Sequence, residues 1–177
     1  MDVRVYDLAS LLLDELTAAL AHTRAGPPDL AVVHPGNTVP QYGCAVAAVR
    51  VVTILPIPGK SPTCPPEYQA TYEMSVDRCY MTPVDNGMPP LGVLDSAARD
   101  ALEDAGAMRK AAHCAWSAGV RRTPGTWTPR GPQGGIHGGA MQVTAAGLTL
   151  ACACAEDAWG AGIDSRIPMR PEDPRYG

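Results

Sequence analysis

The segment from Glu67 to Val76 constrains the fold most, because its apolar and polar residues alternate without a break. The apolar positions are Tyr68, Ala70, Tyr72, Met74 and Val76, and the polar positions are Glu67, Gln69, Thr71, Glu73 and Ser75. Successive side chains of a β-strand point to opposite faces. The segment therefore predicts a strand with one wet face, and that face carries acidic side chains.

A helix is predicted ahead of this strand. Over residues 5–22 the apolar side chains recur every three or four positions, and Gly26-Pro27-Pro28 ends the helix. The run Leu11-Leu12-Leu13 makes the apolar stripe wider than one buried face needs. Two interpretations remain open: a deeply buried helix, or a helix whose second flank packs against a neighbouring subunit.

A second helix is predicted after the strand. Asp95 or Ser96 can cap its N-terminus, and its apolar stripe continues to about Trp116. Beyond the helix the chain becomes rich in Gly, Pro and Arg. Residues 119–139 are therefore predicted to form a long loop.

Three further segments have strand character. Residues 30–34 can form a short strand. Residues 44–55 are rich in Val and apolar on both faces, which indicates a central strand or one covered on both sides. Residues 141–154 alternate again, and a bulge is expected at Gly147.

These elements predict an α+β fold in which a mixed or antiparallel sheet is flanked by two helices. A chain of 177 residues can bury an adequate core in one domain. We expect residues 1–155 to form that domain. Residues 156–177 lose all periodicity and are expected to form an extended C-terminal arm.

Charge and hydropathy limit the possible partners. The net charge is −4 and the arginines form no basic run, so Arg121-Arg122 is interpreted as part of a solvated loop. No apolar run reaches the roughly 18 residues that a membrane span needs, and Met1-Asp2-Val3-Arg4 does not resemble a secretory signal. We expect synthesis in the cytoplasm, with the six cysteines mostly reduced and late disulfides in oxidising surroundings left open.

Three short patterns look like cofactor motifs, and none fits. Gly59-Lys60-Ser61 would end a phosphate loop only if a glycine stood at Ile54. The glycine-rich run over residues 131–139 leads into a predicted strand, whereas a dinucleotide fingerprint opens a helix. Cys152 and Cys154 lack the second ligand pair of a zinc site. No cofactor, metal site or catalytic residue is predicted.

Four short segments follow one another over residues 5–146. They are Val5-Tyr6-Asp7-Leu8-Ala9, Gly43-Cys44 before the Val-rich strand, Arg78-Cys79 followed by Leu94-Asp95-Ser96-Ala97-Ala98-Arg99, and Gly131-Pro132-Gln133-Gly134-Gly135 before the last strand. In this order the chain resembles the tail terminator and head-to-tail connector (neck) proteins of siphophages, of the kind found in actinobacteriophages.

The resemblance implies a structural virion protein. Such a subunit would form a ring with itself, usually a hexamer, at the head-proximal end of the tail. The ring would end growth of the tail tube, contact the major tail protein and other neck proteins, and let genomic DNA pass through a central channel. A head-completion stopper or another connector ring is the alternative, and a small cytosolic enzyme is the remote one.

Six residues are candidates for these contacts. Leu11 and Leu13, together with Pro58 and Pro62 of a proline-rich loop, are candidate subunit-interface residues. Glu67 and Glu73, on the acidic strand face, are candidates for the wall of the DNA channel. An acidic wall would repel phosphate groups and let DNA slide past.

Overall fold

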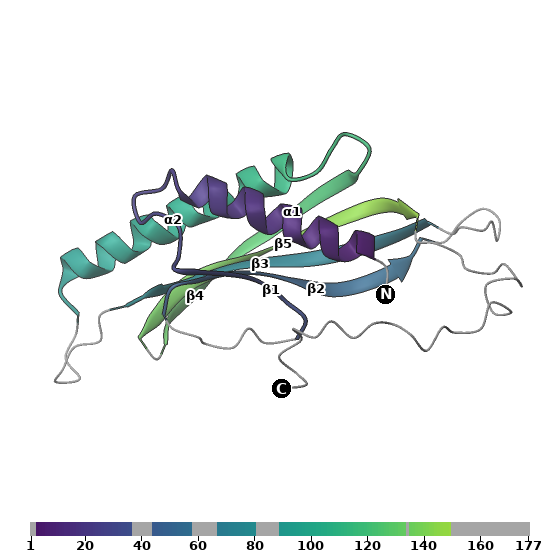
Figure 1. The fold of residues 1–177 in the computed structure, drawn as a ribbon. Helices are drawn as coiled ribbons and strands as arrows, with labels where there is room; N and C mark the ends of the chain where they lie inside the picture. The colour runs from purple at the N-terminus through teal and green to yellow at the C-terminus, as the bar shows by residue number, and fades with distance from the viewer. Residues whose placement is uncertain (1–2, 37–43, 58–66, 81–88, 134, 150–177) are drawn as a thin grey trace, which may run out of the picture.

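The computed structural model describes residues 3–36, 44–57, 67–80, 89–133 and 135–149 (Figure 1). In chain order the elements are α1 (Val3–Leu20), β1 (Leu30–His34), β2 (Val46–Pro56), β3 (Glu67–Cys79), α2 (Leu91–Cys114), β4 (Arg121–Gln133) and β5 (Ile136–Thr149). They form an α+β fold with a five-stranded sheet and two helices. The predicted arm over residues 156–177, and the domain boundary before it, lie outside the described residues.

The strands follow the order β1-β2-β3-β5-β4 across the sheet. β1 is parallel to β2, and all the other neighbours are antiparallel, so the sheet is mixed. β3 lies at the centre, between β2 and β5. β2 is also an interior strand, which confirms one of the two interpretations of its Val-rich sequence.

Both helices cover the same face of the sheet and run side by side in opposite directions (Figure 1). The core lies between the helices and the sheet, where apolar residues of α1 and α2 meet those of β2, β3 and β5. Two buried hydrogen bonds fix this packing, because Tyr72 Oη donates to the Val5 carbonyl and Trp116 Nε1 donates to the Leu8 carbonyl. The opposite face of the sheet carries no described helix.

The predicted loop over residues 119–139 is wrong, because most of it forms β4 and the start of β5. β4 is an edge strand, and an edge strand can place the missing N–H of Pro124 and Pro129 away from its neighbour. Its pairing with β5 also shifts register between Pro124 and Trp127 and again between Arg130 and Gln133. Because prolines and register shifts interrupt the strand pattern, a prediction from that pattern could not identify β4.

The predicted start of the second helix is also wrong. α2 begins at Leu91, four residues before Asp95, and Pro90 occupies the N-cap position. The Pro90 carbonyl accepts hydrogen bonds from the backbone N–H groups of Val93 and Leu94. Because the proline ring fixes φ near the helical value, it favours a helix start without a side-chain cap.

The predicted bulge in the last strand is confirmed. Tyr68 pairs with Leu148 and Gln69 pairs with Ala146, so Gly147 is the extra residue on β5. Its φ of 80° lies in the left-handed region, where glycine has no steric penalty.

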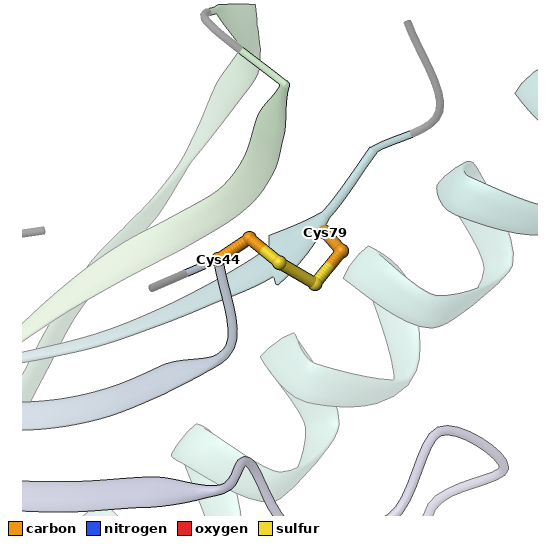
Figure 2. Close-up of a disulfide and its surroundings, with 2 residues drawn as sticks. All are labelled: Cys44 and Cys79. Carbon is orange, nitrogen blue, oxygen red and sulfur yellow. A yellow bond between two sulfur atoms is a disulfide. The ribbon is translucent and has the colours of Figure 1, made fainter. Parts of the chain in front are cut away.

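One disulfide corrects the expectation that the cysteines are reduced. Cys44, just before β2, is bonded to Cys79 at the end of β3 (Figure 2). The antiparallel pairing of β2 with β3 brings these two residues together although 35 positions separate them. The bridge therefore links the beginning of one interior strand to the end of the next.

Candidate interaction surfaces

The face of the sheet away from the helices is called the open face here. It is formed by alternate residues of the five strands, and the acidic positions of β3 lie on it. Three ion pairs cross it, and each joins a carboxylate of β3 to a guanidinium on another strand. They are Glu67–Arg121, Glu73–Arg50 and Asp77–Arg130.

Glu67 and Glu73, the two predicted channel residues, differ in their surroundings. The Glu67 side chain is 56% exposed and lies 3.2 Å from Arg121 of β4. Glu73 is only 21% exposed, accepts a 2.8 Å hydrogen bond from Arg50 Nε and a longer one from Gln142. Burial by itself would raise the pKa of the Glu73 carboxyl, but the hydrogen bonds from Arg50 and Gln142 and the charges of Arg50 and Arg130 together outweigh it, so this pKa lies below its usual value.

Asp77 continues the same row of carboxylates. Arg130 lies 3.4 Å away, yet burial dominates and raises the pKa of the Asp77 carboxyl. With Glu67 and Glu73, the row has three carboxylates and three arginine partners. The positive and negative charges on the open face therefore balance where these residues lie. Only β3, considered without its neighbouring strands, is acidic.

A shallow hollow of ≈ 540 Å³ lies on the open face between β3, β5 and β4. It is lined by Glu73, Gly125, Thr126, Thr128, Arg130, Ala140 and Gln142. Small residues create the hollow, while its polar groups include members of the ion pairs just described. The lining brings together no nucleophile with a histidine base, so it offers a polar docking surface and no evident reaction centre.

A second hollow of ≈ 280 Å³ lies where α2 begins, beside the end of β3. Its lining includes Tyr80, Asp100 and His137. His137, which falls in the predicted loop over residues 119–139, is a buried residue of β5 whose ring meets Tyr80 edge-on at 5.9 Å. Burial lowers the pKa of the His137 imidazole.

The predicted subunit-interface residues separate into three cases. Leu11 is 49% exposed on the outer side of α1, where another chain can reach it. Leu13 is a core residue with 8% exposure, so the widened stripe partly reflects deep burial within the chain. Pro58 and Pro62 lie outside the described residues.

No group of three or more His, Cys, Asp or Glu side chains among the described residues could hold a metal ion. No described helix is both long and apolar enough to cross a membrane.

Comparisons with known proteins place no further constraint on the chain. No family model matches it, and no curated protein matches it either.

Proposed function

We propose that this protein is a structural subunit of a siphophage neck, and specifically a tail terminator that forms a ring at the head-proximal end of the tail. The observation that carries the proposal is the one-sided layer, with two helices on one face of a five-stranded sheet. The first helix, the two long strands β2 and β3, the second helix and the last strand follow one another as in the order on which the resemblance rests, and β4 is an additional strand between α2 and β5. A fold of this kind has two chemically different faces, one for each type of neighbour in a layered particle.

The open face suits a wall past which DNA moves. Each arginine of the three ion pairs lies within 3.4 Å of a carboxylate of β3, which offsets its attraction for phosphate. A channel that held DNA by salt-dependent contacts would slow its passage. In the proposed ring, Glu67 and Glu73 face the channel, and balanced charge takes the place of the purely acidic wall expected from β3.

The experiment removes the gene from the phage that encodes the protein and examines the particles by negative-stain electron microscopy. A terminator is required to stop tube growth, so we expect tails longer than wild type and filled heads without tails. A plasmid copy of the gene should restore both tail length and joining.

Two other results would contradict this assignment. Tails of normal length beside heads that lose their DNA would favour the head-completion stopper. Normal, infectious particles would exclude any essential neck function.

A further inference from the structure

We propose that copies of this protein contact one another through their helices, with the outer face of α1 in one copy against the outer face of the second half of α2 in another. This contact deepens the proposed function, because a ring requires a surface by which subunits recognise each other. The inference depends on that function only for the presence of neighbouring copies.

Exposed apolar side chains gather on the helices. Among the described residues, eight large hydrophobic side chains are exposed, and the five on the helices are Tyr6, Leu11, Leu91, Leu94 and Leu102. Leu91 and Leu102 are 78% and 64% exposed. Contiguous exposed apolar surface is typical of protein–protein contacts. On α2, Leu102 borders the second half of the helix, whereas Leu91 and Leu94 belong to the first half and lie outside the proposed contact.

Charge distinguishes α1 from the second half of α2. After Arg4, the only charged residues of α1 are Asp7, Asp14 and Glu15, and all three are acidic. After the buried Asp104, the charged residues of α2 are Arg109 and Lys110, both basic and both exposed. Over the described residues, no ion pair within the chain involves these acids of α1 or these bases of α2. The layer of helices thus carries acidic side chains on α1 and basic side chains on the second half of α2. Within the described residues, these side chains form no ion pairs with one another.

The open face of the sheet provides the contrast. Its carboxylates already have arginine partners inside the subunit. A second copy would gain little by pairing with charges that are already satisfied. On the helix layer it would bring opposite charges together around apolar side chains such as Leu11 and Leu102.

The charge pattern favours a second copy over a nucleic acid. A polyanion attracted to Arg109 and Lys110 would also meet the acidic α1, which packs beside α2. A second copy presents both signs, so its α1 can lie against the α2 of one neighbour while its α2 lies against the α1 of the next, which is the head-to-tail contact that a ring requires. A surface that contains both halves of a contact is the requirement for self-association.

The test exchanges the charges between the two helices. One variant carries Asp7→Lys and Asp14→Lys, and a second carries Arg109→Glu and Lys110→Glu. Sedimentation velocity measures the self-association of each protein at about 0.01 M salt, where the screening length is about 30 Å, and at about 1 M salt. We expect wild type to associate weakly at low salt, and each variant to associate about tenfold more weakly because like charges then meet.

Two restored combinations make the test specific. An equimolar mixture of the two variants should associate about as well as wild type, since each altered helix finds an oppositely charged partner. One chain that carries all four substitutions should also recover. A control with Asp29→Lys adds positive charge at an exposed position outside both helices, so it should associate like wild type.

Three outcomes would overturn the inference. They are a wild-type protein that remains monomeric at low salt and high concentration, a mixture that does not recover, and a control that weakens as much as the helix variants. These results are independent of tail length in the gene-deletion experiment. A failed contact and a failed neck function can therefore be told apart.

Discussion

Arg78 of β3 and Asp104 of α2 form a buried, forked ion pair. Arg78 Nη2 lies 2.7 Å from Asp104 Oδ1, and Arg78 Nε lies 3.0 Å from Oδ2. The two residues are 7% and 1% exposed. Arg78 Nη2 also donates to the carbonyl of Gly26, so a single guanidinium joins the central strand, α2 and the segment after α1. Most other contacts between the helices and the sheet are apolar and therefore not directional. The hydrogen bonds of this pair are directional, so they fix the orientation of the helices on the sheet in addition to the packing.

We predict that Asp104→Asn lowers the free energy of unfolding by about 3–5 kcal/mol, because it leaves the Arg78 charge buried without its partner. Urea denaturation followed by circular dichroism measures the change. The matched control is Asp95→Asn, which breaks the exposed Asp95–Arg99 pair on the same helix and should cost less than about 1 kcal/mol. Equal losses in the two variants would contradict the structural role given to the buried pair.

The Cys44–Cys79 bridge leads to a prediction about redox conditions. It closes a loop across 35 positions, for which chain entropy gives about 3–4 kcal/mol of stabilisation. Reduction with dithiothreitol should therefore lower the melting temperature by roughly 6–16 °C for a domain of this size. The variant with Cys44→Ser and Cys79→Ser should melt at the reduced temperature with or without dithiothreitol. A wild-type melt that is insensitive to reductant would show that the bridge contributes little.

His137 gives a pH dependence whose sign follows from burial. Its pKa is lower in the folded protein than the ordinary 6.5, so the unfolded chain takes up a proton at higher pH than the folded chain. This contribution to stability is fully present above about pH 6.5 and is lost as the pH falls toward the folded pKa. Denaturation at pH 5.5 and 7.5 should show wild type less stable at the lower value.

A substitution separates His137 from the carboxylates that also titrate in acid. His137→Gln removes the proton-binding group, so the loss of stability between pH 7.5 and 5.5 should become smaller. Lowering of the Glu73 pKa acts in the same direction only at still lower pH, near the usual range of carboxyl groups. An unchanged pH dependence in His137→Gln would assign it to other groups.

The sequence predicted the strands that obey a simple pattern. Alternation identified the two faces of β3, and a glycine in an alternating segment identified the bulge at Gly147. The same reasoning could not see β4, since prolines that normally end a strand are tolerated at the edge of a sheet. Edge position is a property of the whole sheet and has no local signature.

The sequence also could not predict which residues of different strands would pair with one another. Arg50 and Glu73 are 23 positions apart, and Arg121 and Glu67 are 54 apart. Only the strand order and register bring these charges together, so the acidic strand face could be predicted while its neutralisation could not. The pairing of Cys44 with Cys79 depends on the same register, because six cysteines allow fifteen complete connectivities.

The last prediction tests whether the open face lines a DNA channel. Glu67→Lys is the better probe, because Glu67 is more than half exposed and its change should leave the fold stable. Glu73→Lys would instead place an ammonium beside Arg50 in a half-buried site and should destabilise the subunit by about 1–3 kcal/mol.

In assembled particles, Glu67→Lys adds positive charge at the wall and releases Arg121 from its partner. Both changes favour contacts with phosphate, so DNA ejection should slow at low ionic strength and recover at higher salt. Glu67→Gln is the control and should show a smaller delay, since it frees Arg121 without adding a new cation. If correctly assembled Glu67→Lys particles eject DNA at the wild-type rate at every salt concentration, the open face does not line the channel.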